Sequence, residues 1–476
     1  MAQTLKPYPA YKDSGVPWVE KVPAHWKLRS IDSLAVPISL RGRPELPLLS
    51  VLRERGVVLR STLGEDENRN FIPDDLSNYR VVRKGNLVIN KMKSWQGSLG
   101  VSAHDGIVSP AYFVYDLHVN DGRFLHCLLR SKPYVHLFAQ ASDGIRIGQW
   151  DLSVARMKRI GVPIPPDGEQ DTIVRFLAHA DRHINRFIRA KRRLVGLLNE
   201  QKQAIIHRAV TRGLDPDVRL KPSGIDWLGD VPEHWEATRL KYVAKVQTGV
   251  TLGKTYGSAV LESRPYLRVA NVQDGYLDLK DIATVNVPTS EAAGCELQVG
   301  DVLMTEGGDI DKLGRGYIWR GEIRRCLHQN HIFAVRSQRR VLLPDYLSLL
   351  MTSFHGRSYF QLTAKQTTNL ASTNTTTLRA FPFFLPSVHE QERLLDNVSK
   401  DSDSLDTTIS RSLMKINLIR EYRTRLVADV VTGKLDVRAV ELPALGEEEV
   451  LEDWDEGTGE EADEVAETQE IALADV

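Results

Sequence analysis

Three short stretches of the sequence hold residue types that could do chemistry. The first, GVTLGKT at residues 249–255, is rich in glycine and carries a lysine, as does the phosphate-binding loop of nucleotide-hydrolysing proteins. That loop needs four residues between its glycines, whereas this stretch has three. We therefore expect no nucleotide site here. Instead, Lys254 and the backbone N–H groups are expected to contact phosphates of a nucleic acid.

The second stretch, QDGYLDLK at residues 273–280, contains Asp274, Asp278 and Lys280. Two acids and a lysine around a cation are typical of a metal-dependent nuclease. Here the acids are only four positions apart, which favours solvated charges on a hairpin. A self-contained metal-dependent DNA nuclease nevertheless stays the alternative function.

The third stretch, CLHQNH, contains Cys326, His328 and His331. Zinc sites take four ligands, and no fourth ligand stands at a suitable spacing. The sequence also lacks an Asn-Pro-Pro-aromatic stretch for methylating a flipped adenine. We therefore expect no catalytic residue, no metal and no cofactor in this chain, so that any chemistry on DNA must come from a partner.

The charge of the chain is divided unevenly along its 476 residues. The formal net charge is zero, with 62 basic and 62 acidic residues, but the part from Glu447 onward has 14 acidic residues and no Lys or Arg. The remainder therefore carries a net charge of +14 and should attract polyanions. The acidic end is predicted to be a disordered tail, either a solubilising one or an internal mimic of nucleic acid.

Composition also bears on location. The three cysteines are dispersed and odd in number, which favours a reducing cytoplasm over a disulfide framework. No apolar run reaches the roughly 20 residues of a membrane helix, and residues 1–13 lack the apolar core of a signal peptide. We expect a cytoplasmic protein that does not bind membranes.

A tryptophan segment occurs twice, as SGVPWVEKVPAHW at residues 14–26 and as SGIDWLGDVPEHW at residues 223–235, 209 positions later. An internal repeat of this kind determines the architecture before any other feature does. Its four tryptophans are expected to pack inside the protein, and they are Trp18, Trp26, Trp227 and Trp235.

A second pair of matches has an offset of 221 positions. IPPDGEQ (164–170) matches LPSVHEQ (385–391), and VTRGLD (210–215) matches VTGKLD (431–436). An unchanged offset over this length, with apolar residues at steps of three, four and seven, predicts two helices of about 40 residues. The predicted apolar stripes are Ile173, Leu177, Ile184, Ile188, Leu194, Leu198 and Ile205, and Leu394, Val398, Leu405, Ile409, Leu413, Ile416, Ile419 and Leu426. Such narrow stripes require a partner helix, and we expect each helix to pair with its own copy.

Between the helices lie two globular segments with a shared order of mixed α/β elements. Strands are predicted within residues 83–92 and 109–115 of the first segment and within 298–307 and 330–336 of the second. Matching short helices are predicted at residues 124–131 and 346–353. The residues between these landmarks differ, so one scaffold carries two different surfaces.

In these motifs the chain resembles the specificity subunit of type I restriction-modification systems. The resemblance rests on the tryptophan segments, on YLRVANVQDGYLDL (266–279), on LVINKM…GVS…GIVSPAY (87–112) and on the two Glu-Gln helix starts. It implies an α+β fold of two target-recognition domains held apart by two long antiparallel helices that form a coiled coil, with a pseudo-twofold internal repeat. The implied partners are double-stranded DNA with a split recognition sequence, two methyltransferase subunits and motor-nuclease subunits. A further alternative, a coiled-coil adaptor without DNA contacts, leaves the positive body unexplained.

The division into domains follows from these landmarks. We expect a first recognition domain at 1–165, a central helix at 166–213, a second recognition domain at 214–386, a C-terminal helix at 387–436 and an acidic tail at 437–476. Glu169, Gln170, Glu390 and Gln391 at the helix starts are assigned to docking of the partner subunits. Arginine, lysine, asparagine and glutamine side chains read base edges, and the expected reading surfaces are Lys91, Lys93, Trp95, Gln96, Arg146, Gln149 and Trp150, and Lys254, Arg268, Asn271, Arg315, Lys365, Gln366, Thr368 and Asn369.

Overall fold

The computed structural model describes residues 5–16, 19–64, 72–144, 150–257, 260–308, 313–314, 316–366 and 371–442. Trp18, Arg146, Gln149, Arg315, Thr368, Asn369 and the acidic tail beyond Leu442 lie outside the described residues. The chain divides into two compact units. Of the described residues, unit 1 combines those up to Arg192 with Leu413–Leu442, and unit 2 is Arg193–Ser412.

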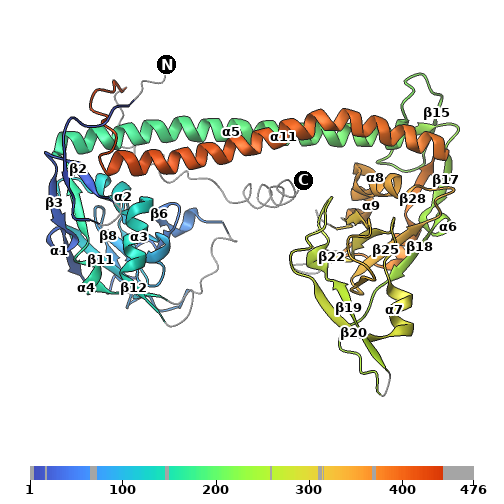
Figure 1. Ribbon diagram of the computed structural model, residues 1–476, viewed down its shortest axis with the longest axis horizontal. Helices are drawn as coiled ribbons and strands as arrows, with labels where there is room; N and C mark the ends of the chain where they lie inside the picture. Colours follow the sequence, from blue (N-terminus) through green and yellow to red (C-terminus); the bar gives the residue numbers. More distant parts are fainter. Residues whose placement is uncertain are drawn as a thin grey trace. The chain divides into compact units, whose positions relative to one another are not determined.

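Two long helices each contribute one half to each unit (Figure 1). Helix α5, Asp167–Arg212, has 46 residues, and helix α11, Val388–Val431, has 44. At 1.5 Å per residue each is about 65–70 Å long. Both helices end before a glycine in the left-handed conformation, Gly213 at φ +72° and Gly433 at φ +77°. The prediction of two long helices is therefore confirmed.

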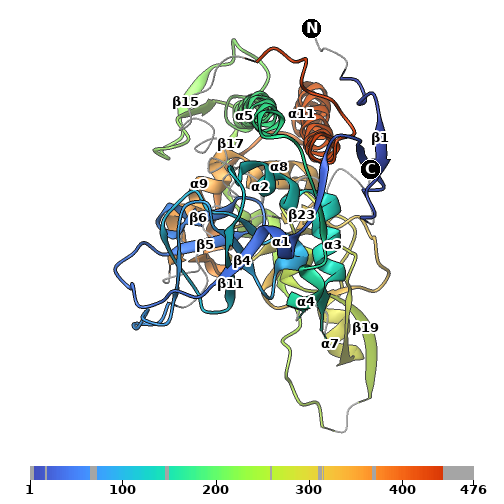
Figure 2. The same ribbon diagram turned by 90° about the vertical axis from the view of Figure 1, so that its left-hand side faces the viewer.

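Figure 2 shows α5 and α11 end-on, lying side by side, and contacts within each unit show that they run antiparallel. In unit 1, Arg423 donates to both carboxylate oxygens of Asp181 at 2.9 Å, while Ile173 shares a core cluster with Val430. In unit 2, Lys202 binds Asp406 at 2.7 Å, while Ile206 shares a cluster with Leu394. In both units, the residue numbers of the α11 partners therefore decrease as those of α5 increase.

Most residues of the predicted stripes are buried. Residues Ile173, Leu177, Ile184 and Ile188 of α5 are buried, as are all of the predicted α11 positions except Ile419. The second half of α5 differs, because Val195 and Ile206 are buried whereas Leu194, Leu198 and Ile205 are only half-buried. In a straight helix, positions seven residues apart do not point in quite the same direction. The buried positions therefore shift by one residue along the helix.

The two units contain the same four-stranded antiparallel sheet. In unit 1 its order is β4-β11-β8-β9, with strands Ala35–Ile38, Tyr112–Leu117, Leu87–Asn90 and Leu99–Val101. In unit 2 its order is β18-β25-β21-β23, with strands Ala244–Thr248, Ile332–Ser337, Val302–Thr305 and Gly316–Ile318. The repeat in sequence is therefore a repeat in topology.

One turn illustrates how the matching sequence produces the matching strand. Gly85 and Gly300 precede β8 and β21 with φ of +92° and +96°, values that favour glycine because it has no Cβ. The next residue closes each turn through its side chain. Asn86 Oδ1 accepts from Arg83 N at 2.9 Å, and Asp301 Oδ2 accepts from Gln298 N at 2.8 Å.

Helices and short hairpins follow each sheet in the same order. Unit 1 has α2 (Arg123–Arg130), α3 (Lys132–Gln140), the hairpin β12–β13 (Ser142–Asp143, Asp151–Leu152) and α4 (Val154–Met157). Unit 2 has α8 (Pro344–Thr352), α9 (Phe354–Thr363), the hairpin β26–β27 (Lys365–Gln366, Ala371–Ser372) and α10 (Thr375–Ala380). Strand β22 (Gly307–Gly308) extends the second hairpin.

The tryptophan segments open the units with matching small elements. Hairpin β1–β2 (Tyr11–Asp13, Lys21–Pro23) corresponds to β15–β16 (Leu220–Pro222, Asp230–Pro232). Strand β3 (Lys27–Ser30) pairs with β14 (Gly161–Ile164), as β17 (Glu236–Arg239) pairs with β28 (Pro382–Leu385). One-turn helices, α1 (Ile31–Leu34) and α6 (Leu240–Val243), follow.

The units differ around this shared frame. Unit 1 adds hairpin β5–β6 (Leu49–Leu52, Gly56–Leu59) and the pair β7–β10 (Arg80–Val82, Gly106–Val108). Unit 2 adds the sheet β20-β19-β24 (Ala283–Pro288, Leu261–Leu267, Leu327–His328) and helix α7 (Thr289–Cys295). The differences lie where the sequences between the landmarks diverge.

Candidate nucleic-acid interface

Each tryptophan segment is fastened to the start of a long helix by one glutamate. We name this arrangement the glutamate anchor. In unit 1, Glu169 Oε1 accepts from Trp26 Nε1 at 2.9 Å, and its Oε2 is 2.7 Å from His25 Nε2. In unit 2, Glu390 accepts from Trp235 Nε1 at 3.1 Å and lies 3.0 Å from His234 Nε2. The repeated His-Trp pair and the repeated Glu-Gln pair are thus the two halves of one structural joint.

The same tryptophans also meet the end of the other long helix. A Cβ built on Gly433 would lie 3.1 Å from the ring of Trp26, and one on Gly213 would lie 3.5 Å from the ring of Trp235. Both rings are fully buried. Packing, rather than stacking on bases, is therefore their role, and Trp227 is likewise packed against the core of unit 2.

The glutamines next to the two anchor glutamates form hydrogen bonds with backbone groups. Gln170 Nε2 donates to the carbonyl of Pro165 at 2.9 Å. Gln391 Nε2 donates to the carbonyls of Val341 and Pro386, while its Oε1 accepts from Leu343 N at 2.9 Å. These side chains cannot meet a partner without losing internal hydrogen bonds. Within the chain, Glu169, Gln170, Glu390 and Gln391 thus have a structural role, and their docking of partner subunits stays a prediction.

Of the first predicted reading surface, the described residues are Lys91, Lys93, Trp95, Gln96 and Trp150. Trp95 lies in the one-turn helix η2 (Ser94–Gln96) after β8, and Trp150 directly precedes β13. Their rings are 5.2 Å apart at 46°. Trp95 Nε1 donates to the carbonyl of Met92 at 3.0 Å, which fixes that ring. The structure thus brings together residues that lie more than 50 positions apart in the sequence.

The two lysines of this surface differ in their surroundings. Lys91 Nζ is 2.6 Å from a carboxylate oxygen of Asp151, so a phosphate would have to compete with that acid. Lys93 is exposed, and its ammonium has no acidic partner within the described residues. The sequence did not predict the pairing of Asp151 with Lys91. The position of Asp151 directly after Trp150 was the one signal that it lies at the same loop.

The second set of predicted contacts is dispersed. Lys254 binds Glu291 at 2.7 Å, and this hydrogen bond raises the pKa of the Lys254 ammonium and lowers that of Glu291. Arg268 binds Asp281 at 2.6 Å. Lys365 and Gln366 are exposed on strand β26, the counterpart of β12. Among the described residues, the ion pairs of Lys254 and Arg268 are with Glu291 and Asp281, and neither pair involves β26.

Asn271 is the most buried of the predicted contacts that the structure describes. It is 4% exposed, its amide donates to the carbonyls of Asp278 and Asp281, and its oxygen accepts from Arg268 N at 2.8 Å. In this structure its polar atoms hold the 268–281 turn. A contact between Asn271 and a base would require these hydrogen bonds to break, and it stays a prediction.

The stretches that suggested chemistry have structural roles. A Cβ on Gly249 would lie 1.9 Å from the carbonyl oxygen of His328, so this glycine permits close packing of two chain segments. Asp274 binds Arg357 at 3.2 Å. His328 is fully buried, and burial lowers its pKa to about 4. Among the described residues no group of three or more His, Cys, Asp or Glu side chains could hold a metal ion.

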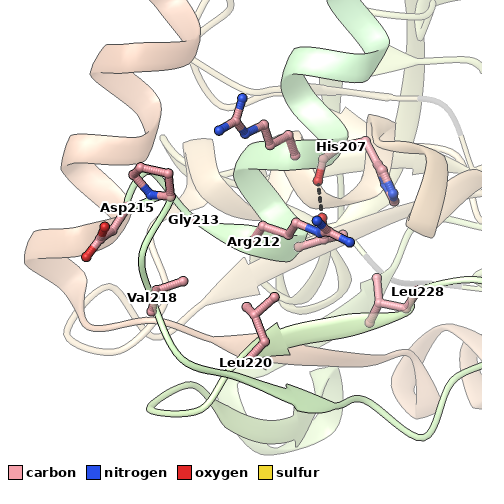
Figure 3. Close-up of a pocket in the computed structure, with 10 residues that line it drawn as sticks. His207, Arg212, Gly213, Asp215, Val218, Leu220 and Leu228 are labelled. Atoms are coloured by element: carbon pink, nitrogen blue, oxygen red, sulfur yellow. Dashed lines mark hydrogen bonds between the residues drawn. The ribbon is translucent and has the colours of Figure 1, made fainter.

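A cavity of about 510 Å³ lies at the end of α5 in unit 2 (Figure 3). His207 and Arg212 line it from the helix, and Val218, Leu220 and Leu228 line it from the segment that follows. The hydroxyl of Thr211 donates to the carbonyl of His207 at 2.7 Å, a bond within the last turns of α5.

The sequence of the chain is similar to those of type I restriction enzyme specificity subunits. No family model matches the chain. The chain is 24% identical over 230 residues to the putative type I restriction enzyme MjaX specificity subunit of Methanocaldococcus jannaschii, which covers 48% of this chain and 52% of that protein. It thus spans about half the length of that relative. It is 21% identical over 402 residues to the type I restriction enzyme StySPI specificity subunit of Salmonella potsdam, covering 78% of this chain and 82% of that one.

The fold has a solved counterpart. A chain in a structure concerning complex assembly and conformational transition of the type I R-M system superposes with a TM-score of 0.58 at 14% identity, over 86% of this chain and 98% of that one. This likeness shows the fold of two mixed α/β domains and two long helices. Among the described residues, no helix is long and apolar enough to cross a membrane.

Proposed function

We propose that this relative of the type I restriction enzyme specificity subunits is the non-catalytic DNA-recognition subunit of a type I restriction-modification complex. Its two recognition domains, at 1–165 and 214–386, each read one half of a split target in double-stranded DNA. Two methyltransferase subunits, which use S-adenosylmethionine, and motor-nuclease subunits supply the chemistry. The complex acts in the cytoplasm.

One observation carries the proposal. The order β4-β11-β8-β9 recurs as β18-β25-β21-β23, while the added elements around each sheet differ completely. A bipartite target needs two readers on equivalent frames with different contact surfaces. A nuclease would not require this duplication, and the acids that suggested one are separately engaged.

The proposed contacts now separate into two groups. Lys93, Trp95, Gln96 and Trp150 form a compact group on unit 1, to which Lys91 belongs through its pair with Asp151. On unit 2 the exposed Lys365 and Gln366 occupy the equivalent hairpin. Arg146, Gln149, Arg315, Thr368 and Asn369 remain proposals from the sequence alone.

The decisive experiment exchanges one reader. Residues 27–164, from β3 to β14, would be replaced by the corresponding segment of a relative, which leaves both glutamate anchors in place. Mapping of methylated sites in a host that supplies the methyltransferase subunits should show one half of the target changed and the other unchanged. A change in both halves, or in neither, would contradict the independence of the readers.

A second experiment tests the lysines. Lys93→Ala should weaken binding to duplex DNA and reduce the slope of log affinity against log salt by about one, because one phosphate contact is lost. Lys91→Ala should change the slope less, since Asp151 already neutralises that ammonium. Lys21→Ala, an exposed lysine on β2, is the control and should leave the slope unchanged.

A further inference from the structure

Unit 2 has an acid where unit 1 has a predicted DNA-contacting lysine. Strands β8 and β21 hold the same place in the two sheets and end at Asn90 and Thr305. The next residue is Lys91 in unit 1 and Glu306 in unit 2. The same offset of 215 positions relates the turn glycines that precede the two strands. Lys91 and Glu306 are therefore equivalent residues of the repeat.

Both residues lie beside the hairpin that carries predicted base contacts. The carbonyl of Lys91 accepts from Leu152 N at 3.0 Å, and the carbonyl of Glu306 accepts from Thr373 N at 2.8 Å. Leu152 belongs to β13, and Thr373 directly follows β27. Strand β26, which pairs with β27, carries the two exposed contacts predicted for unit 2. Glu306 thus adjoins the predicted reading surface of unit 2.

A histidine holds the carboxylate of Glu306. His331 Nδ1 is 2.6 Å from Glu306 Oε2, and Glu306 N donates to the carbonyl of His331 at 2.9 Å. The side chains of Glu306 and His331 are 30% and 55% exposed, so the pair is open to solvent. Among the described residues, no hydrogen bond reaches Glu306 Oε1. One carboxylate oxygen is therefore fixed by His331, and the other is available to a ligand.

The shared frame does not require this pair. At the equivalent place in unit 1, the ammonium of Lys91 is bound by Asp151. Strands β11 and β25 are preceded by Ala111 and His331, so the histidine is also particular to unit 2. The frame folds with either charge at this position, and both members of the acid–histidine pair differ from unit 1 together.

The chemistry of a carboxylate narrows what Glu306 can contact on DNA. A carboxylate and a phosphate both carry negative charge and both only accept hydrogen bonds, so Glu306 cannot bind the backbone. In the major groove the base donors are the amines of cytosine and adenine. Beside its amine adenine presents the acceptor N7, which would repel a carboxylate, whereas cytosine presents only the N4 amine. Cytosine is therefore the base that fits.

We propose that Glu306 reads a cytosine in the half-site of unit 2 by accepting a hydrogen bond from its N4 amine. His331 is the positioning residue that orients the carboxylate. The inference rests on the proposed function and adds to it one base and the residue that specifies it.

The target sequence provides the first test. The exchange of residues 27–164 identifies the half-site of unit 2, because that half stays unchanged. We expect this half-site to contain a G·C pair. A half-site of A·T pairs and unspecified positions alone would overturn the proposal, whether or not any variant folds.

The second test changes the preferred base. The full chain, assembled with its methyltransferase subunits, would be titrated with duplexes that differ only at the G·C pair. The parent should prefer the original pair to the inverted one by about tenfold. Because lysine favours guanine, Glu306→Lys should prefer the inverted pair by about tenfold, and Glu306→Ala should bind both equally. The matched control, Glu233→Ala, removes another exposed acid of unit 2 and should discriminate as the parent does.

The positioning role of His331 has its own readout. His331→Ala should lower the discrimination at the same base pair from about tenfold to about threefold, because the carboxylate loses the hydrogen bond that orients it. A merely structural role would weaken binding to all duplexes alike and leave the ratio unchanged, which would contradict the positioning role.

The remaining outcomes separate the two proposals. Unchanged discrimination in Glu306→Lys and Glu306→Ala, or an equal loss of affinity for every duplex in variants whose circular dichroism matches the parent, would overturn the cytosine contact. If the parent complex methylated no split target, the proposed function would fail. If it did and both variants kept the same target, the cytosine contact alone would fail.

Discussion

The glutamate anchor of unit 1 is more enclosed than that of unit 2, although the two occupy equivalent places in the fold. The side chain of Glu169 is 6% exposed, and Tyr8 donates a third hydrogen bond to it at 2.6 Å. The side chain of Glu390 is 22% exposed and is bound by His234 and Trp235. The offset of 209 positions places the exposed Asp217 where unit 1 has Tyr8.

The difference teaches how a repeat can keep its topology while its two joints differ in strength. In unit 1 the third donor comes from the N-terminal segment, and burial together with Glu169 raises the pKa of the Tyr8 hydroxyl. In unit 2 an aspartate stands there, which could not approach a second carboxylate. The enclosed joint should therefore contribute more to stability than the open one.

The largest expected effect is at the anchors themselves. Glu169→Ala leaves two buried donors, the Tyr8 hydroxyl and Trp26 Nε1, without an acceptor and removes the partner of the exposed His25. It should lower the stability of unit 1 by about 4 kcal/mol, whereas Glu390→Ala should cost unit 2 about 2 kcal/mol. Hydrogen exchange of the amides in β3 and β14, against those in β17 and β28, measures each unit separately. Equal losses of protection would show that the third hydrogen bond contributes nothing.

The glycines that end the long helices should show a smaller contrast in the same direction. A Cβ on Gly433 would lie 2.3 Å from the ring of Pro23, whereas the nearest atom to one on Gly213 is 3.5 Å away. Gly433→Ala should therefore cost about 3 kcal/mol through strain and overlap, and Gly213→Ala about 1 kcal/mol through its positive φ alone. Thermal unfolding followed by tryptophan fluorescence measures the loss of stability in each variant. A larger loss for Gly213→Ala than for Gly433→Ala would contradict the prediction.

Acid should affect the two units almost alike, which is the smallest expected contrast. Burial, with the nearby Arg130, lowers the pKa of His126 in unit 1 to about 3, and burial lowers that of His328 in unit 2 to about 4. Between pH 6.5 and these values the unfolded chain binds a proton that the folded chain does not. Stability should therefore fall as the pH falls, by about 2 kcal/mol per histidine between pH 7.5 and 5.

Urea unfolding at several pH values provides the measurement. His328→Asn should flatten the acid loss of unit 2, whereas the exposed His118→Asn should leave it unchanged. Unit 1 should go on losing stability down to about pH 3 after unit 2 has levelled off near pH 4. If unit 2 of His328→Asn still lost stability as the pH fell, the loss would come from carboxylates instead.

The repeated frame could be predicted because its signals are local. Each signal depends only on residues that are close in the sequence. Such signals are turn glycines such as Gly85 and Gly300, the alternating strands and the apolar stripes, and their matching order revealed the common topology. The one-residue shift at Val195 and Ile206 escaped prediction, because it depends on the helix path over many turns. The fold class was thus available from the sequence.

The site was less accessible, because a residue type does not reveal its partner. Asn271 has the chemistry of a base reader, but the 268–281 turn uses all of its polar atoms. Glu169 and Glu390 look available at the helix starts, yet each binds a tryptophan from a segment more than 140 positions earlier. That joint left a signal in the sequence, because His-Trp recurs after 209 positions and the Glu-Gln of the helix start recurs after 221.

The exchange of half-helices between the units has a consequence for biosynthesis. Unit 2 is complete once Ser412 has been made, whereas the core of unit 1 waits for Leu426, Val430 and Val437. These residues leave the ribosome roughly 240 positions after Arg192, which at about 5–20 residues per second is a delay of about 10–50 s. During that time Ile173 and Leu177 lack their final cover. We therefore expect the first half of the protein to be synthesised to be the last to finish folding, and to be the half that gains most from a chaperone.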